Sequence, residues 1–316
     1  MNQLKKPKIS VIILHVFGTD HILNCLESVF KSDYPNLEVL VVFNGNNDNS
    51  LKKVQEKFSS VICITNKKNL GFVVGNNQGM ERASGSIYFL LNDDTIIHSR
   101  LISVLEEELS DNEKTGIVGP KIYFANEPRK IWFAGGAIDW ENQNTSLLGK
   151  NTQDKDWLDS KKEVEFITGC ALMIKKEVVD KIGYLDKIFF AYYEDADWSL
   201  KARKAGYKIM YVPFGGVWHV KSATSSSIFF GKEKQRTIFW IAPAYLYRCS
   251  MGEFRQVRNK FIFFNRYLPK RLKNKFLLKS LFVALPSLIW NLVFHIPKSL
   301  IQLALKKIKH SPDFSQ

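Results

Sequence analysis

Apolar residues recur along the first 120 residues in two alternating patterns. Short runs rich in Ile, Val and Leu, typical of buried strands, cover residues 9–14, 39–43, 61–65, 86–91 and 116–119. Between these runs the apolar positions recur every three or four residues, as on one face of a helix, over 22–30, 51–58, 75–83 and 101–109. Strands that alternate with helices predict right-handed βαβ units, and therefore an α/β fold with a mainly parallel sheet flanked by helices.

Beyond residue 120 the pattern is less regular. Further strands are predicted over 164–168, 171–174, 208–212 and 217–219, with a helix that begins near residue 195. The polar stretch 139–162 is expected to be a surface loop. A Ser/Thr-rich segment over 222–227 then marks the predicted boundary between a domain over residues 1–224 and a region over residues 225–316.

The charge of the chain changes at this boundary. Residues 225–316 hold 17 Lys and Arg against 3 Asp and Glu, which accounts for the whole net charge of +14. Their mixture of basic and large apolar residues predicts amphipathic helices that lie on an anionic membrane surface. Nucleic acid is the competing partner, but we favour the membrane because residues 281–296 carry no charge. That stretch is broken by Pro286 and is too short to span a bilayer.

Several function classes lack their characteristic residues. No G-x-G-x-x-G follows the first predicted strand and no G-x-x-x-x-G-K-[ST] occurs, which argues against a dinucleotide dehydrogenase and a P-loop NTPase. The four cysteines are widely spaced, which argues against a disulfide scaffold or a zinc ribbon and favours a reducing compartment.

Candidate chemistry lies in the loops that follow the strands, because parallel sheets bind ligands at the carboxyl ends of their strands. Asn92, Asp93 and Asp94 follow a buried strand, and adjacent carboxylates there suit Mg²⁺ or Mn²⁺ that bridges to a diphosphate. A helix N-cap with acidic first-turn residues is the alternative. His219, at the end of a short strand, is either a core residue or a further metal ligand.

A second acidic cluster follows two tyrosines. Glu194, Asp195 and Asp197 occur within four positions and are bounded by Tyr193 and Trp198. A carboxylate in such a place can act as a general base when burial and like-charged neighbours adjust its pKa. The alternative is an acidic helix start with Asp195 as its N-cap.

Over residues 8–224 the order of these motifs resembles the family-2 glycosyltransferases with a GT-A (Rossmann-like) fold, in particular their rhamnosyltransferase-like branch. The matching pieces are Cys25-Leu26-Glu27-Ser28-Val29, Asn44-Gly45 with Asp48, Asn69-Leu70-Gly71-Phe72 with Gly75-Asn76-Asn77, Leu91-Asn92-Asp93-Asp94-Thr95, Gly119-Pro120-Lys121, Thr168-Gly169-Cys170, Glu194-Asp195-Ala196-Asp197, Ala205-Gly206-Tyr207 and His219.

The resemblance implies inverting transfer of a sugar from a UDP- or dTDP-linked donor to a hydroxyl of a glycan or lipid-linked acceptor in cell-surface polysaccharide synthesis. It also implies use of Mg²⁺ or Mn²⁺. With the basic region over 225–316, we expect a cytoplasmic enzyme on the inner face of the plasma membrane and no nucleic-acid partner. The residues it implicates are Asp195, with Glu194 and Asp197, for catalysis; Asp94 and His219 for the metal; His15, Phe17, Phe43, Asn44, Asn69, Gly71, Asn76, Asn77, Asn92 and Asp93 for the nucleotide sugar; and Gly169, Cys170 and Trp198 for the acceptor.

The chain departs from the family pattern at two places. Phe43 stands where the family usually has an aspartate that contacts the base, and His15-Val16-Phe17 replaces Asn-Tyr-Asn. Phe17 and Phe43 are expected to stack on the base instead. The alternative is a catalytically degenerate, glycosyltransferase-like subunit that binds glycolipid or a partner enzyme.

Overall fold

The computed structural model describes residues 6–46, 48–154, 158–220, 251–274 and 276, together with the backbone of two strands at 238–242 and 245–249. The strands of the main sheet are β1 (Ile9–His15), β2 (Leu37–Asn44), β3 (Ile62–Asn66), β4 (Ile87–Asn92), β5 (Thr95–Ile97), β6 (Thr115–Phe124), β7 (Glu127–Phe133), β10 (Lys162–Glu163), β11 (Ala171–Lys175) and β12 (Lys208–His219). Two separate strand pairs are β8 (Gly136–Asp139) with β9 (Asn144–Leu147), and β13 (Ile238–Ala242) with β14 (Tyr245–Cys249).

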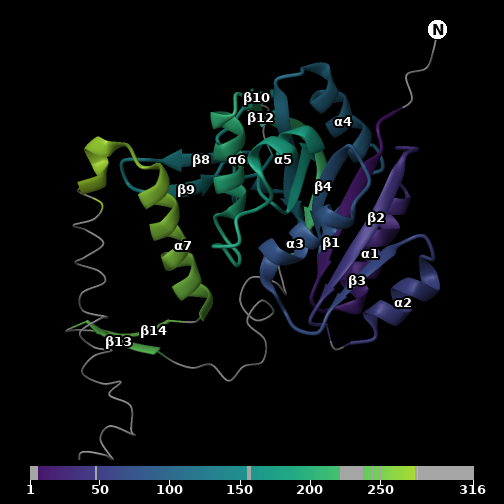
Figure 1. Ribbon diagram of the computed structural model, residues 1–316, viewed down its shortest axis with the longest axis horizontal. Coiled ribbons are helices and arrows are strands. Elements are labelled where there is room, and N and C mark those ends of the chain that lie inside the picture. Colours follow the sequence, from purple (N-terminus) through teal and green to yellow (C-terminus); the bar gives the residue numbers. More distant parts are fainter. Residues whose placement is uncertain are drawn as a thin grey trace, which may run out of the picture.

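The main sheet is mixed and forms the centre of the molecule (Figure 1). Its strands lie in the order β10, β12, β6, β11, β4, β1, β2, β3, while β5 pairs with β12 and β7 with β6. Neighbours among β4, β1, β2 and β3 run parallel, as do β6 and β12, whereas β11 is antiparallel to both of its neighbours. The predicted α/β sheet is therefore confirmed.

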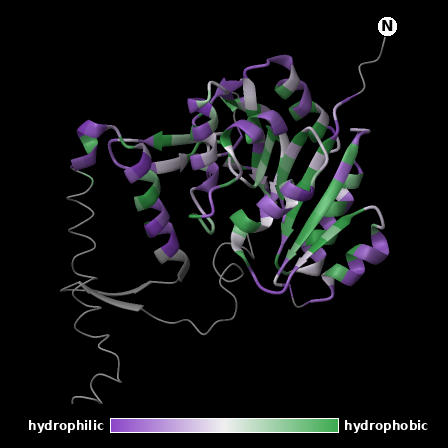
Figure 2. Ribbon diagram, viewed as in Figure 1, coloured by the Kyte–Doolittle hydropathy of each residue, from purple (hydrophilic) through white to green (hydrophobic). Residues whose placement is uncertain are grey.

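Helices flank this sheet. They are α1 (Thr19–Phe30), α2 (Ser50–Lys57), α3 (Gly71–Arg82), α4 (Leu101–Asp111), α5 (Lys176–Ile182), α6 (Glu194–Lys204) and α7 (Met251–Tyr267). α3 packs on β1 and β2, and α4 packs on β6 and β12. All seven residues of β1 are buried, which explains why five of them are apolar, with only Ser10 and His15 polar. In Figure 2 the strands are coloured mainly apolar, whereas the outer helices carry the polar colours.

The register of the central strands places their carboxyl ends at one edge. His15 of β1 pairs with Phe43 of β2, and Leu14 pairs with Asn92 of β4. The loops that begin at these residues therefore meet, as expected for the ligand-binding edge of a parallel sheet.

Two expectations for the middle of the chain are wrong. Residues 164–168 do not form a strand; only Phe166 makes an isolated bridge, to Gly136. The stretch 139–162 contains β9 and the start of β10 rather than being loop throughout. Both strands are short and mostly polar. Their sequences therefore show no alternation of apolar and polar residues from which a strand could be predicted.

The helix α7 lies beside α6 and the β8–β9 pair (Figure 1). Phe263 and Phe264 are buried, and the Phe263 ring centre lies 5.4 Å from that of Tyr193 and 6.4 Å from that of Trp140. The first helix of the basic region thus packs on the domain that precedes it. The predicted boundary at residue 224 and the apolar stretch 281–296 lie outside the described residues. Among the helices that are described, none has the length and apolarity needed to cross a membrane.

Candidate functional site

His15 forms the centre of a buried polar cluster at the end of β1. Its Nδ1 lies 2.6 Å from Oδ2 of Asp93, and its Nε2 lies 2.9 Å from Oγ of Ser50. Burial raises the pKa of Asp93, while the hydrogen bond with His15 acts in the opposite direction. His15 is completely buried, and its contact with Asp93 fixes the position of that carboxylate from the protein interior.

Phe43 does not have the accessible position expected for a ring that stacks on a base. Only 2% of its surface is exposed, and its ring meets the His15 ring edge to face at 5.6 Å between centres. Phe17 is 43% exposed but does not line the cleft described below, to which the neighbouring Val16 contributes. The Phe43 ring is therefore not accessible to a base in this structure.

This burial gives a stability prediction. Phe43→Ala should lower the free energy of unfolding by about 3–5 kcal/mol, as for other large-to-small changes in protein cores. Urea unfolding of the full chain measures it, and Phe17→Ala, which removes an exposed ring, is the matched control and should change stability by less than about 0.5 kcal/mol. A stable Phe43→Ala variant with weakened nucleotide binding would instead restore the stacking role.

The predicted donor-binding asparagines are engaged within the protein. The Asn44 side-chain amide donates to Oδ1 of Asn69 at 3.1 Å and to the Gly71 carbonyl at 3.2 Å. Asn76 donates to the Phe72 carbonyl, and Asn77 exchanges two hydrogen bonds with the backbone of Leu185. Neither these four asparagines nor Gly71 line the cleft among the described atoms. Their hydrogen bonds shape the loops around the site.

Gly71 has a backbone reason for its place at the start of α3. Its φ of 88° favours glycine, and a Cβ there would lie 2.6 Å from the Phe190 ring. The Phe72 amide donates to the Phe190 carbonyl at 2.8 Å. The start of α3 is therefore fitted closely against the segment that precedes α6.

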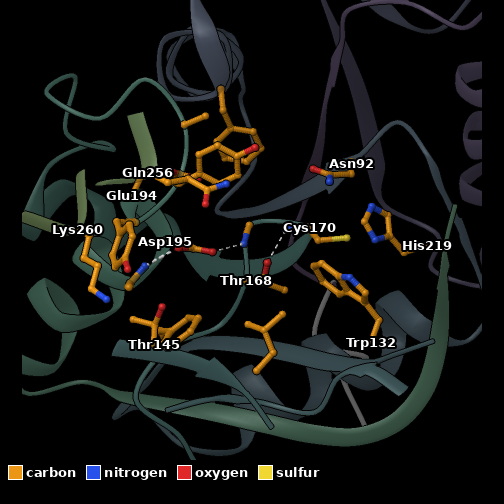
Figure 3. A pocket seen from close by; sticks show the side chains of 18 of the residues that line it. Asn92, Trp132, Thr145, Thr168, Cys170, Glu194, Asp195, His219, Gln256 and Lys260 are labelled. Carbon is orange, nitrogen blue, oxygen red and sulfur yellow. Dashed lines mark hydrogen bonds between the residues drawn. The ribbon is translucent and has the colours of Figure 1, made fainter. Parts of the chain in front are cut away.

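A cleft of about 650 Å³ opens at this edge of the sheet (Figure 3). Asn92 and Asp93 line one part, Thr168 to Cys170 line the middle, and Tyr192 to Ala196 line another part. His219 and Trp132 are also in its wall. Three residues of α7 complete the lining, namely Gln256, Val257 and Lys260.

Asp94 and His219 lie together, as predicted for metal ligands. His219 Nε2 is 3.2 Å from Oδ1 of Asp94, and both side chains are at least nine-tenths buried. Neither ring nitrogen of His219 makes a hydrogen bond within the described structure, and the ring packs on Trp132 at 4.6 Å between centres. A buried carboxylate beside an imidazole with no hydrogen bond fits a divalent cation whose remaining ligands come from a diphosphate. The described residues hold no group of three or more His, Cys, Asp and Glu placed to bind a metal without such help.

Asp195 lies in the wall of the same cleft (Figure 3). Its carboxylate accepts hydrogen bonds from the backbone amides of Gly169 at 3.2 Å and Ala196 at 2.8 Å. Burial raises its pKa, although these hydrogen bonds act in the opposite direction. The residues three and two positions before Asp195 are Tyr192 and Tyr193. Their φ values are 77° and 72°, a left-handed conformation that is rare for aromatic residues.

Glu194 and Asp197, the other two members of the acidic cluster, have different surroundings. Burial, and then the charge of Asp195, raise the pKa of Glu194 well above its usual value. Asp197 does not line the cleft, because it is held by Arg266 Nη1 at 2.6 Å, Lys201 Nζ at 2.8 Å and the Tyr267 hydroxyl at 2.8 Å. This network occupies the Asp197 carboxylate, whereas Asp195 lines the cleft.

Of the three predicted acceptor residues, two line the cleft and one lies in the core. Gly169 and Cys170 line the cleft. Trp198 is completely buried, and its indole donates to the Gly183 carbonyl at 2.9 Å, so it packs in the core and does not contact an acceptor. Sequence reasoning missed Trp132, because nothing in its surroundings in the sequence points to a site, and it missed the contribution of α7.

The fold and the cleft define a GT-A class of structure. A solved structure titled as that of GalNAc-T7 with UDP, GalNAc and Mn²⁺ superposes with a TM-score of 0.57 at 17% identity, covering 69% of this chain and 44% of that one. The profile of "Glycosyl transferase family 2" matches residues 10–183. The chain belongs to glycosyl transferase family 2.

Curated relatives support the same family. A poly-beta-1,6-N-acetyl-D-glucosamine synthase of Staphylococcus aureus (strain MSSA476) is 26% identical over 225 residues, which are 68% of this chain and 52% of that protein. Glycosyltransferase GlyG of Streptococcus pneumoniae serotype 4 is 21% identical over 180 residues, 55% of this chain and 58% of that protein. The chain spans only about half the length of these relatives. The predicted family is confirmed, whereas the rhamnosyltransferase-like branch stays a prediction.

Proposed function

We propose that this chain transfers a sugar, with inversion, from a UDP- or dTDP-linked donor to a hydroxyl of a glycan or lipid-linked acceptor in cell-surface polysaccharide synthesis. The observation that carries the proposal is the cleft itself, which Asp93 and His219 line together with the ionisable carboxylate of Asp195. A donor diphosphate beside Asp94 and His219 would leave its sugar directed toward the part of the cleft that Asp195 lines.

Each half of the site has a defined task in this reaction. Asp195 accepts the proton of the acceptor hydroxyl while the hydroxyl oxygen attacks the anomeric carbon. The bond from that carbon to the diphosphate breaks, and the nucleoside diphosphate leaves with the electron pair. Asp93, held by His15, is placed to accept a hydrogen bond from the ribose. A Mg²⁺ or Mn²⁺ ion held by Asp94 and His219 would neutralise charge on the departing diphosphate.

Relatives and structure support the proposal from independent directions. The similar Staphylococcus protein is named as a synthase of a polysaccharide, and the structural neighbour was solved with a nucleotide, a sugar and Mn²⁺. In this chain the raised pKa of Asp195 is the property expected of a base that works near neutral pH.

A degenerate subunit that binds glycolipid or a partner enzyme is the second candidate. It is favoured by Phe43, which is buried and stands in place of the base-contacting aspartate, and by His15-Val16-Phe17, which replaces the family's Asn-Tyr-Asn. Thermal denaturation of the full chain with a panel of UDP- and dTDP-sugars, with and without Mn²⁺, separates the two. A donor raises the melting temperature if it binds the native state, and no rise with any donor would favour the second candidate.

The basic region over residues 225–316 is proposed to hold the enzyme on the inner face of the plasma membrane. Its net charge of +14 supports attraction to anionic lipid, and its apolar residues support insertion at the interface. The full chain should therefore sediment with anionic vesicles, less as salt rises but not to zero, because salt screens charge and not apolar insertion. Complete release at moderate salt would point to a purely electrostatic partner such as nucleic acid.

A further inference from the structure

The turn before α6 adopts a conformation that needs support from its surroundings. Tyr192 and Tyr193 both have positive φ, and Asp195 follows at the start of the helix, two residues after Tyr193. Residues other than glycine adopt the left-handed conformation where the surrounding structure stabilises it, and such residues are common at active sites. The position of the Asp195 carboxylate therefore depends on what holds residues 191–193.

One side chain of α7 holds this turn directly. Asn259 is completely buried, and its amide nitrogen donates to the carbonyls of Ala191 at 2.9 Å and Tyr192 at 3.0 Å. Its Oδ1 accepts a hydrogen bond from Arg258, which also donates to the Ile188 carbonyl at 2.9 Å. The amide nitrogen of Asn259 thus joins α7 to the segment that leads into α6, while its Oδ1 is bound within α7 by Arg258.

The same helix is anchored at a second point and forms part of the cleft. Arg266 and Tyr267 bind the buried Asp197 carboxylate, in the first turn of α6. Gln256 and Lys260, which are four residues apart and so share one face of the helix, both line the cleft (Figure 3). α7 therefore contacts the base-bearing segment at two points and also faces the space beside Asp195.

We propose that α7 is the acceptor-side wall of the active site and that Asn259 is a positioning residue for Asp195. This inference rests on the proposed function for the role of Asp195, but the contacts themselves do not. Asn259 donates hydrogen bonds to the carbonyls of residues 191 and 192 and so stabilises the turn that precedes α6. The conformation of this turn sets the position of the first residues of α6, and these direct the Asp195 carboxylate toward the acceptor. Gln256 and Lys260, which line the cleft beside Asp195, then contact the hydroxyl-bearing acceptor glycan.

The test compares two alanine variants of the full chain. Asn259→Ala removes both hydrogen bonds to the turn, whereas Asn265→Ala makes the same change on the same helix, where no hydrogen bond to residues 191–195 is present among the described atoms. In Asn259→Ala, hydrogen exchange of the amides over residues 190–196 should accelerate by about tenfold or more while that of β1 and β4 is unchanged. The Asn265→Ala variant should match wild type throughout.

Kinetics give the second measurement. With UDP-N-acetylglucosamine, UDP-N-acetylgalactosamine or dTDP-rhamnose as donor, whichever wild type uses, Asn259→Ala should lower kcat by about 10²-fold, the cost of a small misplacement. The KM for the donor should change less than about twofold, because β1 and β4 build the donor side. Asn259→Asp, which keeps the volume but loses both donors, serves if the alanine variant does not fold.

The outcomes separate this inference from the proposed function. Unchanged exchange over residues 190–196 in a folded Asn259 variant overturns the positioning role, as does a KM for the donor that rises in proportion to the fall in kcat. If no donor is used by wild type, the proposed function fails and the exchange measurement alone decides whether Asn259 holds the turn.

Discussion

Replacing Asp195 by Asn should reduce the rate of sugar transfer by about 10²–10⁴-fold while donor affinity stays close to that of wild type. Asparagine keeps the shape of the side chain, but it cannot accept the proton of the acceptor hydroxyl. Donor affinity should be preserved because the proposed nucleotide site lies at the ends of β1 and β4 and not at the start of α6. Initial rates together with donor titration by calorimetry measure the two effects separately.

The dependence of the rate on pH should change with this substitution. Burial raises the pKa of Asp195, and only the ionised form of a base can accept a proton. The wild-type rate should therefore fall as pH decreases through a value above the usual aspartate range. The residual rate of the Asp195→Asn variant should not show this decrease. Glu194→Gln is the informative comparison, because burial raises the pKa of Glu194 and so favours its protonated form, which glutamine resembles in shape. A large loss in Glu194→Gln with little loss in Asp195→Asn would assign the base to Glu194.

Replacing Asp94 by Asn should abolish transfer and remove the part of donor binding that depends on Mn²⁺. Oδ1 of Asp94 lies 3.2 Å from His219 Nε2, and asparagine removes the negative charge that the proposed cation site needs. Thermal denaturation with donor, in the presence and absence of Mn²⁺, measures the binding. Asp20→Asn, which changes an exposed aspartate in the first turn of α1, is the control and should behave as wild type. An Asp94→Asn variant that keeps the Mn²⁺-dependent rise in melting temperature would remove the metal assignment.

The parts of the fold that sequence predicts well are those with a strong apolar period. β1, β2 and β4 are buried runs of β-branched and aliphatic residues, and their loops must meet once the strands are parallel. The position of the loop that carries Asp93 and Asp94 follows from this topology. His219 lies on β12, which pairs with β5, and only the resemblance to the family placed it beside Asp94.

The errors arise where a residue type suits two environments. Phe43 and Trp198 are aromatic residues beside a site, and aromatic rings both stack on ligands and fill cores; here both rings are buried. Asn76 and Asn77 are amides beside a predicted ligand, but amides also bind backbone groups of neighbouring loops. The choice between these environments depends on tertiary packing, which no local pattern contains.

The place of α7 was not predictable for a different reason. Its basic and aromatic composition favours a membrane surface, yet Asn259, Arg266 and Tyr267 are used against the segment around α6. Asp197 is a residue of the acidic cluster whose partners on α7 lie about 70 positions away in the sequence. A buried carboxylate requires such a partner, but the sequence does not show which cation supplies it.

The most direct test of the central claim is the release of nucleoside diphosphate from a sugar donor, followed by ³¹P NMR with the full chain, Mn²⁺ and a panel of UDP- and dTDP-sugars. The account predicts that at least one donor is consumed, that release requires the divalent cation, and that Asp94→Asn and Asp195→Asn both suppress it. A folded wild-type protein that releases no nucleoside diphosphate from any donor, or an Asp195→Asn variant that releases it at the wild-type rate, would contradict the account.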